Sequence, residues 1–77
     1  MQVTLRFTRG TAAERADVID RLIGCVLLQA ELPSVRYVND GFYFDTERSR
    51  MQIIEDLEYE GFEYAYALGI ASITFEH

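Results

Sequence analysis

The chain has 77 residues and a formal net charge of −6, and 49% of its residues are hydrophobic, among them five Tyr and five Phe. This length and composition are typical of one small domain with a packed core, so we expect a single domain over residues 1–77 and exclude a disordered chain. A single cysteine excludes an internal disulfide framework, no Cys/His cluster indicates a zinc site, and no apolar run reaches the roughly 18 residues that a membrane span requires.

The first periodic segment is QVTLRFT, residues 2–8, in which apolar and polar side chains alternate strictly. This alternation predicts a half-buried β-strand. We expect its inward face to be formed by Val3, Leu5 and Phe7.

A helix is predicted to follow, beginning with a capping box formed by Thr11 and Glu14. Gly24 either ends this helix early or lies on its outer face, and Pro33 stops it in any case. Cys25 lies in an apolar run and is interpreted as a small buried hydrophobe. Helical spacing predicts an apolar stripe made of Ala12, Ala16, Ile19, Ile23, Val26 and Ala30.

The stretch SVRYVNDGFYFD predicts a β-hairpin, with Asp40-Gly41 as a two-residue type I′ turn. That turn fixes the register of the two strands. The predicted cross-strand pairs are Tyr37 with Phe44, Val35 with Thr46, Arg36 with Asp45, and Val38 with Tyr43.

A second helix is predicted from the segment DTERSRMQIIEDLEYEG, capped by Asp45 or Thr46. Its apolar stripe is predicted to be Met51, Ile53, Ile54 and Leu57. We favour an end at Gly61, with Phe62 as the hydrophobic follower. The alternative continues the helix to Leu68, so that residues 62–68 are either a strand or part of this helix.

The C-terminal segment makes a second hairpin if Gly69-Ile70 forms a type II′ turn, which pairs Tyr66 with Ile73 and Tyr64 with Phe75. The predicted order is β-α-β-β-α-β with a probable extra C-terminal strand. This is the ferredoxin-like split βαβ arrangement, an α+β fold with two helices on one face of an antiparallel sheet.

Charge is distributed unevenly along the chain. Residues 1–38 carry five Arg and four acids, whereas residues 39–77 carry two Arg and nine acids, and lysine is absent. Binding to nucleic acid depends on Lys and Arg that neutralise phosphates, so we expect no direct binding to nucleic acid and no membrane partner. A basic protein surface is the partner that this charge favours. The arginine bias suggests a GC-rich bacterial or phage genome. Since the sequence shows neither a signal peptide nor a membrane span, we expect a cytoplasmic location, which is the host cytoplasm for a phage protein.

The predicted topology collects carboxylates at one pole of the molecule, around the end of the second helix. This acidic pole consists of Asp40, Glu55, Asp56, Glu58, Glu60, Glu63 and Glu76. Acids at a helix C-terminus oppose the helix dipole, so helix stability alone does not select them. The alternatives are a solvated face that keeps the protein soluble, a binding pole for a basic partner, and a cation site, for which no calcium-loop spacing is present. In the second case the partner-binding residues are the first six of these acids together with Tyr59 as the anchor.

Catalytic and metal-binding patterns are missing from the sequence. The only His is His77, and no base is indicated near Cys25. Glu55 and Glu58 share a helix face, but no pocket-forming insertion accompanies them. We therefore predict a non-enzymatic protein without a metal or other cofactor.

Four residues, GFYF from Gly41 to Phe44, resemble the core of the RNA-recognition-motif signature. Asp40 stands where that family has a basic residue. The resemblance implies that Phe42 and Phe44 lie on the open face of the sheet and stack on bases.

In size, acidity and lack of catalytic groups, the whole chain is similar to small phage inhibitors, especially anti-CRISPR proteins and other DNA mimics. This resemblance rests on no motif. It implies that surface carboxylates imitate phosphates and occupy the DNA-binding groove of a host protein. The alternative function is a structural module that self-associates through its open sheet face. The sequence leaves open whether the protein is a monomer or a homodimer.

Overall fold

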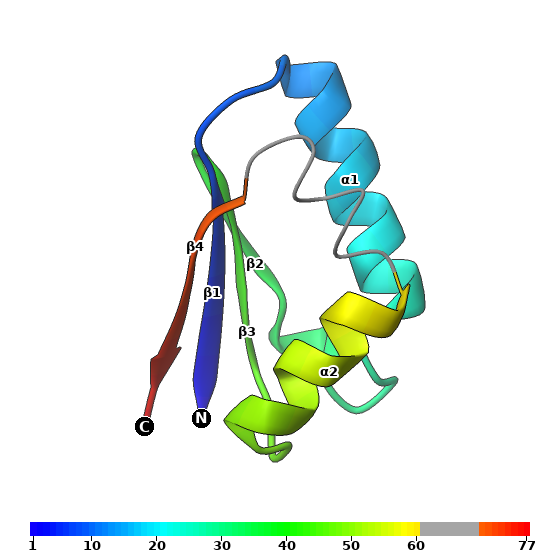
Figure 1. The fold of residues 1–77 in the computed structure, drawn as a ribbon, viewed down its shortest axis with the longest axis vertical. Helices are drawn as coiled ribbons and strands as arrows, with labels where there is room; N and C mark the ends of the chain where they lie inside the picture. Colours follow the sequence, from blue (N-terminus) through cyan, green and yellow to red (C-terminus); the bar gives the residue numbers. More distant parts are fainter. Residues whose placement is uncertain (61–69) are drawn as a thin grey trace.

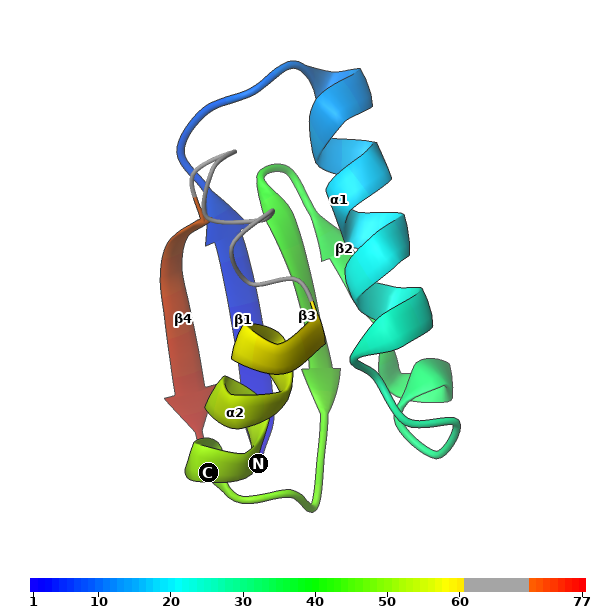
Figure 2. The same ribbon diagram turned by 45° about the vertical axis from the view of Figure 1, so that its right-hand side comes forward.

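The computed structural model describes residues 1–60 and 70–77 of the chain. Two helices lie on one face of an antiparallel sheet whose strand order is β2-β3-β1-β4 (Figures 1 and 2). The sheet is not closed, and β2 and β4 are the outermost of the described strands. No helix among the described residues is long and apolar enough to cross a membrane.

Strand β1, Gln2–Phe7, lies in the middle of the sheet and follows the predicted alternation. Val3, Leu5 and Phe7 are all buried, as the pattern predicted. Burying large apolar side chains removes their surface from water and is the main source of stability in a domain of this size. The core that they form also includes side chains from both helices, from the two residues after α1 and from β3: Val18, Leu22, Val26, Leu27, Phe42, Phe44, Ile53 and Leu57.

Helix α1, Ala12–Cys25, begins with the predicted capping box. The Glu14 backbone N–H donates to the Thr11 hydroxyl over 3.1 Å, and the Thr11 N–H donates to the Glu14 carboxylate over 3.2 Å. Gly10 precedes the cap with φ of 98°, which L side chains rarely adopt. The helix start is therefore determined by local chemistry.

The predicted apolar stripe of α1 was correct in part: Val26 is buried and Ile19 and Ile23 pack against the core, but Val18 and Leu22 were missed. Val18 and Leu22 are buried, whereas Ala12, Ala16 and Ala30 are exposed and Ile19 and Ile23 only partly buried. Larger side chains gain more from burial than alanine does, so they set which side of the helix faces the sheet. The helix ends at Cys25, one residue past the exposed Gly24, and Cys25 is exposed instead of buried, because Val26 and Leu27 take the core positions there.

Strands β2, Arg36–Val38, and β3, Gly41–Asp45, form the expected hairpin in a different register. Arg36 pairs with Tyr43 and Tyr37 with Phe42, so the connecting residues are Asn39 and Asp40. Among the described residues only Gly10 has a positive φ, which rules out a type I′ turn at Asp40-Gly41. A Cβ at Gly41 would lie 1.8 Å from the Leu5 carbonyl oxygen, so this glycine serves the close approach of β3 to β1.

A short 3₁₀ helix, η1 (Leu32–Ser34), comes before β2. Helix α2, Arg50–Glu60, follows β3. Ser49 caps α2, because its hydroxyl accepts the Gln52 N–H over 3.2 Å. The predicted caps Asp45 and Thr46 were wrong. Ile53 and Leu57 are buried as predicted, but Met51 is 67% exposed. The choice between Gly61 and Leu68 as the helix end falls outside the described residues.

Strand β4, Ile70–Glu76, pairs antiparallel with β1, from Gln2 opposite Glu76 to Phe7 opposite Ile70. The two ends of the chain therefore lie side by side (Figure 1). The predicted hairpin partners Tyr64 and Tyr66, and the expected strand at residues 62–68, fall outside the described residues. The register places Glu76 beside the start of β1, at the end of the sheet opposite Asp40, so Glu76 does not join the predicted acidic pole.

Candidate functional site

The two ends of the predicted acidic pole are separated in the structure. Asp40 lies in the β2–β3 turn, where its carboxylate accepts a hydrogen bond from the Arg6 guanidinium over 2.7 Å. Helix α2 starts from the other end of β3 and ends about halfway along the sheet (Figure 1). Asp40 is thus paired locally with Arg6 at a different end of the sheet from the start of α2. Glu63 and the side chain of Glu60 fall outside the description of the structure.

The outward side of α2 carries three of the predicted partner-binding residues, Glu55, Glu58 and Tyr59, together with Met51. Met51, Glu55 and Tyr59 follow one another at four-residue spacing, and Glu58 lies beside them on the helix surface. We call these four residues the outer face of α2. Tyr59 is 87% exposed, and both carboxylates are exposed. Ile53 and Leu57 on the opposite side hold the helix against the core.

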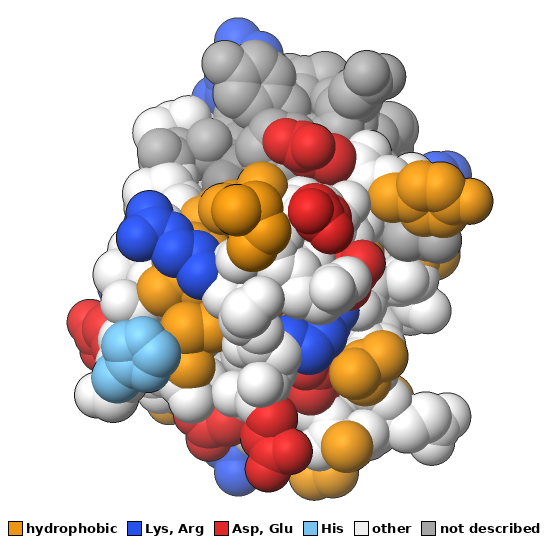
Figure 3. Space-filling model, turned by 60° about the horizontal axis from the view of Figure 1, so that its bottom comes forward, with side chains coloured by type: hydrophobic (Ala, Val, Ile, Leu, Met, Phe, Trp, Pro, Cys, Tyr) orange, Lys and Arg blue, Asp and Glu red, His pale blue; other side chains and the backbone are white. Residues whose placement is uncertain are grey.

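This outer face combines apolar and acidic side chains. Two large apolar side chains, Met51 and Tyr59, flank carboxylates that accept no hydrogen bond from any described residue. Figure 3, which brings the end of the molecule with the two termini forward, shows hydrophobic and acidic side chains side by side on the surface. Exposed aromatic and Met side chains are enriched where proteins bind other proteins.

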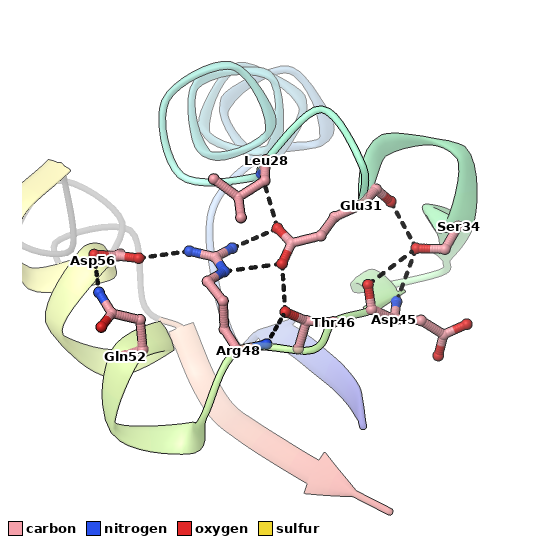
Figure 4. A network of polar contacts seen from close by, with 8 residues as sticks. All are labelled: Leu28, Glu31, Ser34, Asp45, Thr46, Arg48, Gln52 and Asp56. Carbon is pink, nitrogen blue, oxygen red and sulfur yellow. Dashed lines mark hydrogen bonds and ion pairs between the residues drawn. The ribbon is translucent and has the colours of Figure 1, made fainter.

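A third predicted acid, Asp56, belongs to a different structure. Its carboxylate accepts hydrogen bonds from the Arg48 guanidinium over 2.6 Å and from the Gln52 side-chain amide over 2.9 Å (Figure 4). Arg48 also donates to both carboxylate oxygens of Glu31, over 2.9 and 2.5 Å. We call Glu31, Thr46, Arg48 and Asp56 the buried ion network.

Glu31 is the most deeply buried member, with 4% of its surface exposed. Besides the two bonds from Arg48, it accepts one from the Leu28 backbone N–H over 2.8 Å and one from the Thr46 hydroxyl. Thr46 accepts the Arg48 N–H over 3.0 Å in turn. All four bonding positions of the Glu31 carboxylate are thus occupied.

The charge states of the network follow from these bonds. Burial alone raises the pKa of Glu31, but the hydrogen bonds from Arg48, Thr46 and the Leu28 N–H outweigh burial and hold the pKa below its ordinary value. Burial likewise lowers the pKa of Arg48, and the bonds to Glu31 and Asp56 more than reverse this, so the net shift is upward. Both groups are therefore charged at neutral pH.

The buried ion network was not predicted. Glu31 and Arg48 are 17 residues apart and lie in segments between the regular elements, so no periodicity connects them. Thr46 was interpreted as a helix cap because it precedes a helix, which is the usual meaning of that signal. No local pattern distinguishes a hydroxyl that caps a helix from one that binds a carboxylate elsewhere in the chain.

The open face of the sheet carries little apolar surface. Alternate residues of a strand point to opposite faces, so Thr4, Tyr43 and Thr74 point away from the helices while Val3, Phe42 and Phe44 point toward them. Phe42 and Phe44 are 0% and 1% exposed, with ring centroids 6.1 Å apart in the core. The expectation that these rings stack on bases was therefore wrong, because they lie on the buried face.

Neither metal ligands among the described residues nor similarity to known proteins indicates a function for these side chains. The described part of the chain contains no group of three or more His, Cys, Asp or Glu side chains that could hold a metal ion. No protein-family model, no curated protein and no solved structure matches the sequence.

Proposed function

We propose that this chain is a non-enzymatic protein-binding module whose outer face of α2 contacts a basic surface of a partner protein. The observation that carries the proposal is Tyr59, 87% exposed beside the carboxylates of Glu55 and Glu58, which have no partner among the described residues. Keeping a large aromatic ring in water costs free energy, and a partner that covers it supplies an anchor. The carboxylates select a partner with Lys or Arg around the pocket for that ring.

A specific form of the proposal is an inhibitor that occupies a nucleic-acid-binding groove, as DNA mimics of the anti-CRISPR kind do. Net charge supports it, since residues 39–77 hold nine acids against two Arg. The finer fold assignment, the ferredoxin-like split βαβ arrangement, is proposed on the strand order β2-β3-β1-β4 with both helices on one face. Self-association through the open sheet face has less support, because that face carries mainly Thr, Ser, Gln and Arg side chains.

Affinity capture tests this proposal. The full chain is immobilised and exposed to a bacterial lysate at low and high salt, beside Glu55→Lys/Glu58→Lys and Tyr59→Ala variants. A control, Asp20→Lys/Glu76→Lys, makes the same charge change at two exposed positions on other elements. We expect one basic protein to be captured by wild type and control, lost with both α2 variants, and displaced by duplex DNA. A captured protein that ignores both α2 variants would leave the outer face as a solvated surface.

A further inference from the structure

A surface hollow of about 460 Å³ lies beside the buried ion network and is not part of the outer face of α2. Met1, Leu28 and Ala30 line it with apolar atoms, and Leu28 is 50% exposed there. Its volume falls within the range of roughly 300–1,000 Å³ that is usual for ligand pockets. The question is which chemistry such a hollow accepts.

Carboxylates outnumber cationic groups around this hollow, since Glu31, Asp45 and Glu47 line it beside Arg48 and the Met1 amino group. Arg48 lines it, but all three guanidinium nitrogens already donate to carboxylates, two to Glu31 and one to Asp56. The Glu31 carboxylate already accepts four hydrogen bonds. No buried side-chain N or O atom of the described residues lacks a hydrogen-bond partner. The side chains of the network are therefore hydrogen-bonded to one another at the base of the hollow. A ligand contacts mainly the apolar wall and the rim.

The rim is acidic. Asp45 and Glu47 line the hollow, both side chains are exposed, and neither carboxylate has a partner among the described residues. The two positive groups that line the hollow already donate hydrogen bonds to the protein: Arg48 to the network, and the Met1 amino group to the Thr46 carbonyl over 3.1 Å. Asp56 adds a second carboxylate to the single guanidinium of the network. An apolar wall below two free carboxylates suits a cation with an alkyl stem.

We infer that this hollow binds the alkyl stem and cationic head of a Lys or Arg side chain supplied by the partner protein. The stem lies against Leu28, Met1 and Ala30, and the head reaches the carboxylates of Asp45 and Glu47. This inference rests on the proposed function, because it takes the partner to be basic. It extends the contact from the outer face of α2 to the neighbouring segments 28–34 and 45–48.

The experiment is an NMR titration of the full chain with three probes that share one alkyl stem: n-butylammonium, n-butanol and butyrate. We expect saturable shifts with butylammonium at the amides of Leu28, Ala30 and Thr46, weaker shifts with butanol at the same amides, and none with butyrate. Asp45→Asn/Glu47→Gln should weaken butylammonium binding roughly fivefold and leave butanol unchanged, as loss of two exposed charge contacts does. Leu28→Ala should weaken both.

The matched control is Glu55→Gln/Glu58→Gln, which removes the same charge from the outer face of α2 and should leave butylammonium binding unchanged. Equal shifts with butyrate, or butylammonium binding that is insensitive to Asp45→Asn/Glu47→Gln, would overturn the assignment. Its failure is separable from that of the proposed function. If capture of a basic protein still depends on Glu55 and Glu58 while butylammonium does not bind, only the hollow is wrongly assigned.

Discussion

Four carboxylates around α2 fall into two pairs with opposite surroundings. Glu31 and Asp56 converge on the single guanidinium of Arg48, whose side chain is only 10% exposed. Glu55 and Glu58 project into solvent from the same helix that carries Asp56 and have no partner in the described part of the chain. Neighbouring acids in a sequence thus have unrelated roles: one pair holds segments of the chain together, and the other is available to a partner.

The difference between the pairs is one of desolvation. Removing a charge from water costs several kcal/mol, and the cost is offset only when hydrogen bonds and an opposite charge replace the lost water. Glu31 has four such bonds. Glu55 and Glu58 keep their water, so their removal leaves nothing unsatisfied. Each prediction below tests this contrast.

The largest effect is expected for Arg48→Ala, which leaves Glu31 buried without a counter-charge. Breaking a buried pair on one side costs about 3–5 kcal/mol of unfolding free energy. Urea unfolding followed by circular dichroism measures this loss. Arg50→Ala is the control, since Arg50 is exposed and its guanidinium carbon lies 5.1 Å from the centre of the Phe75 ring. Equal, small losses for the two variants would mean that the network contributes nothing to stability.

Acid should reveal the same network. The pKa of Glu31 is lower in the folded chain than in the unfolded chain, so its stabilisation is complete above about pH 4.5 and is lost as pH falls through the folded value. Glu31→Gln cannot lose this contribution. We therefore expect urea midpoints of wild type to fall more steeply than those of Glu31→Gln between neutral pH and pH 3. Parallel curves would assign the acid sensitivity to other carboxylates.

Asp56→Asn should cost about 1–2 kcal/mol, because it weakens a hydrogen bond to a charged donor at a half-buried position. Glu55→Gln one residue away should change the unfolding free energy by less than about 0.5 kcal/mol. Thermal melting of the two variants compares adjacent acids directly. Reversing the charge of Asp56 should destabilise the fold further, since its carboxylate accepts a hydrogen bond from Arg48.

The smallest effect is expected for Glu55→Lys/Glu58→Lys, which should raise the melting temperature slightly. Cations near a helix C-terminus interact favourably with its dipole, by a few tenths of a kcal/mol at exposed sites. Differential scanning calorimetry at low salt gives the sign. A marked fall in melting temperature would show that these acids are structural, and the contrast between the pairs would disappear.

The parts of the fold that local patterns predicted are those that local chemistry determines. The alternation in β1, the capping box of Thr11 and Glu14, and the burial of Ile53 and Leu57 each depend on residues a few positions apart. The hairpin register was wrong because Gly41 is required by the carbonyl of Leu5, which lies far away in the sequence. The Asp-Gly dipeptide gives the same signal whether its glycine forms the turn or admits a neighbouring strand.

The candidate site likewise contains residues that local patterns place correctly and residues whose position depends on distant contacts. Exposure of Glu55, Glu58 and Tyr59 follows from helical spacing once Ile53 and Leu57 are placed inside. The use of Asp56 by Arg48, and the position of Glu76 at the far end of the sheet, depend on how distant segments pack. Nothing local in the sequence of α2 distinguishes Asp56 from Glu55.

The pairing of β1 with β4 has a consequence for how the chain folds during synthesis. β1 precedes the other described elements in the sequence and lies in the middle of the sheet, yet its neighbour on one side, β4, follows all of them. Until residues 70–76 leave the ribosome, one edge of β1 exposes unpaired backbone groups beside a partly covered core. Contacts between the ends of a chain close slowly, because the longest loop has to be ordered first. The nascent protein therefore pairs both edges of β1 only after residues 70–76 have emerged, and α1 and the β2–β3 hairpin have to protect the growing core until then.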